Sequence, residues 1–237
     1  MSAYVRIELT RMFRDGGYLM LSLVLPVFMY LLVGRTAGPG DDHSLAVVRL
    51  VSAAAFGALG VAVNSCTSIA EDRSKGWLRQ LRLTPLSPVQ VVLGRGACAL
   101  AVVILPILAV GIVGAAWGGV TMSVAGWLSS ALVLWLAVTP IVLLGLALGY
   151  LVRPAVAQIL GPVCYLVLTG LGGLFIPPTG WVARIGQLSP TYRYSEVAAD
   201  AALGDTPSWT AIAVLLCWTV AAAALAAHAY HRAGRRL

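Results

Sequence analysis

The segment EDRSKGWLRQLRLTPLSPVQ, residues 71–90, concentrates charge in a chain that contains very little of it. Its first twelve positions hold six charged side chains, whereas the whole 237-residue chain has 16 basic and 9 acidic residues. Residues 50–70 before this charged segment carry no charge, and neither do residues 96–152 after it. Long apolar runs around a short charged segment indicate a membrane protein with a connecting loop.

The composition supports the same interpretation. Hydrophobic residues make up 59% of the chain and charged residues 11%, with a mean hydropathy of +0.89, whereas soluble domains are about 25% charged. About 20 apolar residues cross a hydrocarbon core of about 30 Å. Windows of such length lie at 16–34, 50–70, 96–152, 154–183 and 206–230, and glycines between Trp117 and Trp127 divide the longest.

We therefore predict an all-α integral membrane protein with one transmembrane domain over residues 1–237. Its six transmembrane helices are expected near residues 18–37, 47–69, 91–116, 127–151, 155–175 and 208–230. In residues 1–17, apolar and basic side chains fall on opposite faces of a helix, which predicts an N-terminal amphipathic helix in the headgroup layer. A basic tail that only fixes the orientation is the alternative.

The distribution of basic residues predicts the orientation, because such residues collect on the cytoplasmic side of a membrane. With six spans, four basic residues fall on one face: Arg35, Arg49, Arg184 and Arg193. The other face receives the remaining twelve, namely Arg6, Arg11, Arg14, Arg73, Lys75, Arg79, Arg82, Arg95, Arg153, Arg232, Arg235 and Arg236. Both termini are therefore expected in the cytoplasm. The excess of basic over acidic residues is explained by the orientation of the chain in the membrane and by contact with anionic lipid. No nucleic acid is expected as a partner.

Neither a metal site nor an enzyme active site is predicted. The cysteines Cys66, Cys98, Cys164 and Cys217 lie singly in apolar helices, as small buried hydrophobes do. His228 and His231 stand one helical turn apart without a carboxylate or cysteine beside them. No cluster of catalytic residue types lies in or beside the spans, which argues against a membrane-bound enzyme.

The charged segment has more structure than a loop that only orients the spans. Acidic residues come first and basic residues follow, as the helix dipole favours, and Thr84-Pro85 ends the helical pattern. We predict a short amphipathic helix on the cytoplasmic side that serves as a docking element. A solvated, orientation-setting loop is the alternative.

Two blocks of sequence resemble one family. EDRSKGWLRQLRLTPLSPVQVVLGR, residues 71–95, resembles the cytoplasmic segment of type-2 ATP-binding cassette (ABC) transporter permeases, in which an acid, Lys-Gly, a leucine-rich turn, Thr-Pro-Leu-Ser and Gly-Arg occur in that order. Residues 172–205, with their glycine-rich start, prolines, tryptophan and Pro-x-x-Tyr step, are similar to the outer segment of the same family before its last span.

This resemblance implies a permease subunit that pairs with a second permease, as a homodimer or heterodimer, and with a nucleotide-binding ATPase. It also implies that the docking element is a coupling helix that contacts this ATPase, with a docking role for Glu71, Asp72, Lys75, Gly76, Trp77, Arg79, Arg82, Thr84 and Pro85. No G-x-x-x-x-G-K-[ST] loop occurs, and the only lysine, Lys75, follows Glu-Asp-Arg-Ser. No cofactor is therefore expected on this chain, and ATP and Mg are expected on the partner ATPase. The expected location is the bacterial cytoplasmic (inner) membrane, as a multi-pass protein.

Residues 174–194 suggest an outer re-entrant segment. Trp181, Val182, Ile185 and Leu188 fall on one helical face, but about ten residues before Pro190 are too few to cross the bilayer. A half-helix that dips in and returns would cover the outer end of a pathway. An ordinary interfacial loop is the alternative.

Polar residues at helical spacing inside the spans indicate a substrate pathway, because polar groups in a bilayer face protein or water. The polar candidates are Asn64, Thr67, Gln158, Tyr165 and Thr169. The aromatic side chains of Phe56 and Phe175 complete the set, because they could pack against a cargo. Helix packing is the alternative for each of them, and Gly145-x-x-x-Gly149 is a packing signature of that kind.

The expected cargo is a hydrophobic or amphipathic drug, antibiotic or lipid-like molecule, because the apolar windows offer no charge to balance a strongly charged substrate. A polysaccharide, which needs a long aromatic and hydrogen-bonding channel, is the rival cargo. A sensing or immunity module that detects membrane-active compounds is the alternative to export. An adjacent histidine kinase gene would favour the alternative.

The orientation can be measured with single cysteines introduced at Ser2, Ser44, Ser123 and Ser208 in a background without the four native cysteines. An impermeant thiol reagent applied to intact cells should label the Ser44, Ser123 and Ser208 positions and leave the Ser2 position unlabelled, because basic residues resist translocation. Labelling of Ser2→Cys from outside would contradict the predicted orientation.

Overall fold

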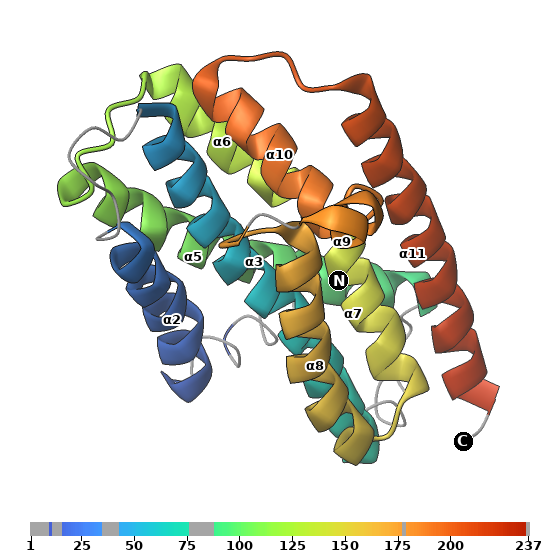
Figure 1. Ribbon diagram of the computed structural model, residues 1–237. Coiled ribbons are helices and arrows are strands. Elements are labelled where there is room, and N and C mark those ends of the chain that lie inside the picture. The colour runs from blue at the N-terminus through green and yellow to red at the C-terminus, as the bar shows by residue number, and fades with distance from the viewer. Residues whose placement is uncertain (1–9, 11–15, 35–42, 76–87, 177–178, 236–237) are drawn as a thin grey trace.

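A computed structural model of the protein describes residues 10, 16–34, 43–75, 88–176 and 179–235. Within these ranges the secondary structure is helical without strands, which confirms the all-α prediction (Figure 1). The helices are α2 (Gly16–Gly34), α3 (His43–Ser74), α5 (Pro88–Ala116), α6 (Val124–Ala137), α7 (Thr139–Leu151), α8 (Pro154–Gly172), α9 (Gly180–Gly186), α10 (Pro190–Leu203) and α11 (Trp209–Arg235).

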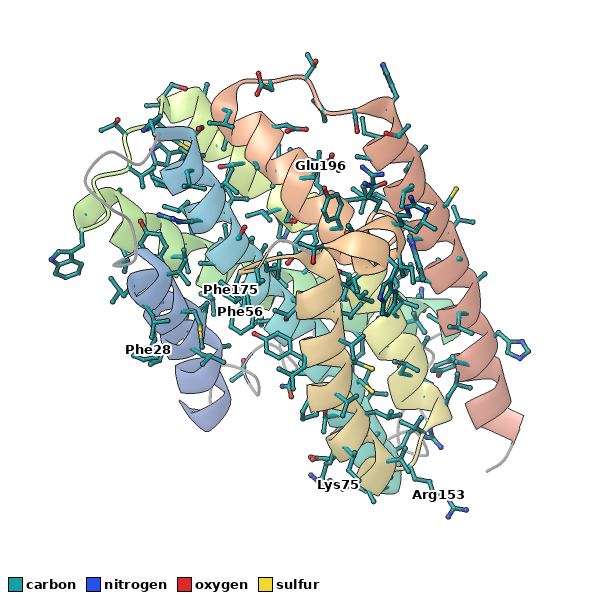
Figure 2. All side chains as sticks on the ribbon, viewed as in Figure 1. Phe28, Phe56, Lys75, Arg153, Phe175 and Glu196 are labelled. Atoms are coloured by element: carbon teal, nitrogen blue, oxygen red, sulfur yellow. The ribbon has the colours of Figure 1, made fainter. Side chains whose placement is uncertain are left out.

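Five segments of the described chain are long and apolar enough to cross a membrane: α3, α5, α6 together with α7, α8, and α11. Helix α2 is also apolar, but its stretch Ser22–Val33 is shorter than a span, so the count of six stays a prediction. Large apolar side chains point outward, as Phe28 does on α2 with 54% of its surface exposed (Figure 2). An apolar exterior is typical of a protein surrounded by lipid.

Charged residues gather at the two ends of the bundle. We call the end with Ser74, Pro88 and Pro154 the basic end, where Figure 2 shows Lys75 and Arg153. The other end, called the α10 end, carries Glu196 on α10. This separation of charge from the apolar middle agrees with the predicted division into spans and connections.

Helix α3 occupies the centre of the bundle. In its apolar stretch 78% of the residues are buried, against 17% in α8 and in α11, and it packs against α2, α5, α7, α8 and α10. Figure 1 shows α2 and α11 at opposite edges, with α3 between them. Its sequence SAAAFGALG, residues 52–60, is built from small residues, which let neighbouring helix backbones approach closely.

The Gly145-x-x-x-Gly149 pattern packs α7 directly against α3, as predicted. A Cβ atom at Gly145 would lie 2.5 Å from the Ala62 carbonyl oxygen, and one at Gly149 would lie 2.7 Å from the Cys66 carbonyl oxygen. Both neighbouring atoms belong to the backbone of α3, so they cannot rotate away. Only glycine therefore fits at these two positions.

The predicted helix over residues 127–151 is two helices in the structure, α6 and α7, with a break at Val138. Pro140 causes the break because it has no N–H to donate to the carbonyl of Leu136. The Thr139 hydroxyl donates to that carbonyl instead, at 2.6 Å. The sequence contains Pro140, so the break could have been predicted from it.

The chain after α8 forms two short helices, α9 and α10. Trp181, Ile185 and Leu188, which were predicted to share one face, are exposed, and Trp181 exposes 73% of its surface. The Trp218 indole donates to the Leu188 carbonyl at 2.8 Å, which ties the turn between α9 and α10 to α11. A dip of this segment into the membrane stays a prediction, and the predicted N-terminal amphipathic helix lies almost wholly outside the described residues.

Replacing Gly145 with alanine should destabilise the bundle, because the added methyl group would overlap the α3 backbone. Overpacking of this kind costs about 1–3 kcal/mol. The measurement is the thermal unfolding midpoint of the purified protein in detergent. Gly170→Ala on α8 is the matched control, because nothing lies within 4 Å of a Cβ atom at that position. Equal midpoints for the two variants would contradict the packing described for α7.

Candidate functional site: a cavity between three helices

An open cavity of about 410 Å³ lies between α2, α3 and α8. This volume is within the range of about 300–1,000 Å³ that small-molecule sites occupy. The wall is mostly apolar, with a few polar groups. Its lining residues are Ser22, Leu25 and Pro26 from α2, Gly57, Gly60, Val63, Asn64 and Thr67 from α3, and Gln158, Gly161, Pro162 and Tyr165 from α8.

Four of the seven residues predicted for the pathway line this cavity: Asn64, Thr67, Gln158 and Tyr165. Because α3 and α8 run antiparallel, Thr67 and Gln158 lie toward the basic end, whereas Gly60 and Tyr165 lie toward the α10 end. A Cβ atom at Gly161 would lie 3.2 Å from the Thr67 hydroxyl oxygen, and one at Gly60 would lie 3.5 Å from the Tyr165 ring. The Gln158 amide and the Thr67 hydroxyl therefore lie on the basic-end side of the wall, and the Tyr165 ring lies on the other side.

Phe56 and Phe175 lie beyond the lining and form an aromatic cluster with Tyr165 (Figure 2). The ring centroid of Phe56 is 4.8 Å from that of Tyr165 and 4.9 Å from that of Phe175. The Tyr165 hydroxyl donates to the Phe56 carbonyl at 3.2 Å, which fixes the ring across α3. We call these three residues the aromatic cluster. Tyr165 is the member of the aromatic cluster that lines the cavity, on the side of the α10 end.

Thr169, the seventh predicted residue, is not in the lining. It lies one helical turn beyond Tyr165, and its Oγ1 atom is buried without a hydrogen-bond partner among the described residues. An unpaired buried hydroxyl costs free energy. Because Thr169 is absent from the lining, the structure does not support its predicted place in the pathway.

Helix α10 covers the α10 end of α3. Tyr194 is completely buried, and its hydroxyl donates to the Ala55 carbonyl on α3. Burial raises the pKa of this hydroxyl well above its usual value, with a smaller contribution from Tyr165, so Tyr194 stays a protonated donor. A Cβ atom at Gly172 would lie 2.9 Å from Thr191 Cβ, so the end of α8 and the start of α10 also pack closely.

The basic end is held together by α3. Asp72 forms an ion pair with Arg95 on α5, and their side chains are only 6% and 7% exposed. Arg73 donates to the carbonyls of Gly149, Tyr150 and Val152 at the end of α7. A cation at a helix C-terminus is favourable because unpaired carbonyls carry partial negative charge there. The last turn of α3 is thereby joined to α5 and α7.

Glu71 connects this end of α3 with the cavity. Gln158 Nε2, on the cavity wall, donates to Glu71 Oε1 at 3.4 Å, and Lys75 Nζ lies 3.7 Å from Glu71 Oε2. The side chains of Lys75 and Glu71 are 63% and 40% exposed, so water and ions reach this pair.

The predicted coupling helix differs from the structure at its beginning. Glu71, Asp72 and Arg73 belong to α3, which continues without interruption to Ser74. A continuous helix is expected there, because no proline or glycine occurs between Gly60 and Gly76. Six residues predicted to dock the ATPase lie outside the described residues: Gly76, Trp77, Arg79, Arg82, Thr84 and Pro85.

Comparison with known proteins identifies the family of the chain. A model of the family described as "ABC-2 type transporter" matches residues 1–203. The chain belongs to the ABC-2 type transporter family. It is also 25% identical, over 218 residues, to the Bacillus subtilis (strain 168) protein named "Putative transport permease YvfS", and the match covers 89% of each chain.

An ABC-2 permease is the membrane subunit of a transporter and is not itself catalytic. The family normally works with an ATPase partner. The five long apolar helices agree with a multi-pass membrane protein of this kind. The resemblance inferred from residues 71–95 and 172–205 is thus confirmed.

Sequence reasoning missed the contribution of α2 and the ion pair at the basic end. Pro26, inside an apolar helix, was the available signal for α2, because a proline there marks a local irregularity. It meets Gly57, where a Cβ atom would lie 2.9 Å from Pro26 Cγ. Asp72 and Arg95 are 23 positions apart on different helices, and no local pattern pairs them.

Replacing Asp72 with asparagine should destabilise the ABC-2 permease, because Arg95 would keep a buried charge without its carboxylate. Breaking a buried pair costs about 3–5 kcal/mol. Lys75→Met is the matched control, since it breaks the exposed pair with Glu71, and exposed pairs contribute about 0–1 kcal/mol. Thermal unfolding in detergent measures both, and an Asp72→Asn loss no larger than that of Lys75→Met would contradict the role given to the buried pair.

Proposed function

We propose that this ABC-2 permease is the membrane subunit of an ATP-driven exporter that moves a hydrophobic or amphipathic compound, such as a drug, an antibiotic or a lipid-like molecule, across the cytoplasmic membrane. The observation that supports this most directly is the cavity between α2, α3 and α8. It has the size of a small-molecule site and lies at the level of the apolar stretches of three membrane helices.

The chemistry of the lining supports an amphipathic cargo. The lining residues include no charged side chain, and the polar ones are amides and hydroxyls from Asn64, Thr67, Gln158, Ser22 and Tyr165. Such groups orient a ligand through a few hydrogen bonds while Leu25, Pro26 and Val63 pack against its apolar part. A chain of sugars would need a longer run of hydrogen-bonding groups than this wall provides.

Helix α3 provides the physical connection between the cavity and a partner ATPase. Its cavity face, Gly57 to Thr67, and its last residues, Glu71 to Ser74, belong to one uninterrupted helix. In the proposal, the charged segment that follows docks on the ATPase, and ATP binding there displaces α3 together with α5 and α7. A second permease subunit completes the pathway on the open side of the cavity.

Filling the cavity should abolish export without preventing assembly. Gly60→Leu places a large side chain against Tyr165, because a Cβ atom at Gly60 lies 3.5 Å from the ring at ordinary contact distance. The matched control is Ala223→Leu on the exposed face of α11, remote from the cavity. The measurement is ATPase stimulation by a panel of amphipathic compounds, together with ATP-driven uptake into inverted vesicles.

We expect Gly60→Leu to reduce stimulation and uptake at least about tenfold, because a site filled by protein cannot accept a ligand. Copurification of the ATPase subunit should be unchanged in both variants. Full transport by Gly60→Leu, or stimulation of the native complex by sugars and small anions alone, would contradict the proposal.

A further inference from the structure

The cavity is asymmetric along α3. Toward the α10 end its wall includes the Tyr165 ring, behind which Phe56 and Phe175 complete the aromatic cluster. Toward the basic end its wall consists of Thr67 and Gln158, and Gln158 donates to the Glu71 carboxylate. Glu71 follows Thr67 by one helical turn, which is about 6 Å along the axis. One end of the cavity thus suits an apolar group, and the other leads to a negative charge.

Of the other described charges near this end, Arg153 is exposed at the start of α8, and three are engaged with one another or with backbone carbonyls. Asp72 and Arg95 pair with each other, and Arg73 donates to carbonyls at the end of α7. The remaining described acids, Glu196, Asp200 and Asp205, lie on or just after α10, at the opposite end of the bundle. Lys75 contacts Glu71, but the pair is exposed and its oxygen–nitrogen distance is 3.7 Å. A ligand cation can therefore compete with Lys75 for Glu71.

The hydrogen-bonding groups that a ligand meets at the basic end of the cavity are acceptors. Because Nε2 of Gln158 donates to Glu71, the amide oxygen of Gln158 is left to accept from a ligand. The carboxylate of Glu71 is an acceptor as well. A head group that carries both a positive charge and N–H donors satisfies these acceptors. An anionic head group would meet them with repulsion.

From this arrangement we infer that the cavity selects cationic amphiphiles, whose positive head group binds Glu71 and Gln158 while the apolar part extends toward the aromatic cluster. This inference rests on the proposed export function and names its substrate class. The charge remains at the exposed end of the cavity, so no ion has to be buried among the apolar residues of the spans. Glu71 is then a specificity-determining residue.

The test uses three probes with the same tail and different head groups: decylammonium, decanol and decyl sulfate, each below the concentration at which it forms micelles. Occupancy is read as protection of a Ser22→Cys reporter from a maleimide, in membrane vesicles that contain the full chain and its ATPase partner. Ser22 lines the cavity, and the four native cysteines are replaced beforehand. A Ser44→Cys reporter, exposed at the far end of α3, controls for effects on the bilayer.

We expect decylammonium to protect at about three- to tenfold lower concentration than decanol, as a partly exposed ion pair with added hydrogen bonds allows. Decyl sulfate should be the weakest probe. Glu71→Gln keeps the shape of the side chain and removes its charge, so it should bring decylammonium to within about twofold of decanol. Lys75→Gln removes the competing cation and should increase the advantage of decylammonium, which a purely structural role of Glu71 would not produce.

Equal protection by the three probes, strongest protection by decyl sulfate, or an unchanged ranking in Glu71→Gln would overturn the inference. If Glu71→Gln fails to assemble, the Lys75→Gln measurement decides. An advantage of decylammonium over decanol that does not increase in Lys75→Gln contradicts the role of Glu71. ATP-driven movement of the probes is measured in the same vesicles. Protection without any movement would contradict the export function alone, whereas movement with an unselective ranking would contradict only the preference for cations.

Discussion

The close approach of helix backbones along α3 is the constraint on which the architecture is built. In a membrane, the apolar exterior gives helices no hydrophobic reason to associate, so packing at short range has to hold them together. Alanine, glycine and serine along α3 let α7 approach to direct backbone contact at Gly145 and Gly149. Between α3 and its neighbours α2 and α8, space remains beside Gly57, Gly60 and Gly161. The cavity lies in that space.

Much of this fold was accessible from the sequence, because membrane spans are determined by length and polarity. The predicted spans agree with the helices to within a few residues for α5, α8 and α11, and the glycine pair on α7 packs as expected. The end of α3 was placed too early because the charge of Glu71 and Asp72 was interpreted as the start of a separate cytoplasmic helix. Their charge is compatible with the helix continuing, since Asp72 finds Arg95 on another helix. Pairing between distant helices leaves no periodic signal.

The candidate site was predicted only in part, because a periodic pattern within one helix does not show which other helices face it. Asn64 and Thr67 on α3, and Gln158 and Tyr165 on α8, repeat at helical spacing, and this repetition identified them. Phe56 shares the periodicity of α3, and Phe175 was chosen as an aromatic side chain that could pack against a cargo. Both lie outside the cavity wall, where Phe56 contacts the Tyr165 and Phe175 rings. The residues of α2 are apolar or small and carried no such signal. A wall made by three helices depends on their relative rotation, which tertiary packing determines and periodicity within one helix does not.

The break between α6 and α7 divides a single membrane crossing between two groups of helices. Helix α6 packs mainly on α10, to which Ser129 is bonded through the Ala201 carbonyl at 2.8 Å, whereas α7 packs on α3 and α11. Pro140 removes one bond of the backbone ladder and Thr139 replaces it with a side-chain bond, whereas Val138 still donates to the Leu134 carbonyl and accepts from the Val142 amide. One membrane crossing is therefore anchored twice, by its first half on α10 and by its second half on α3 and α11. Its weakened ladder lies where the two sets of contacts meet.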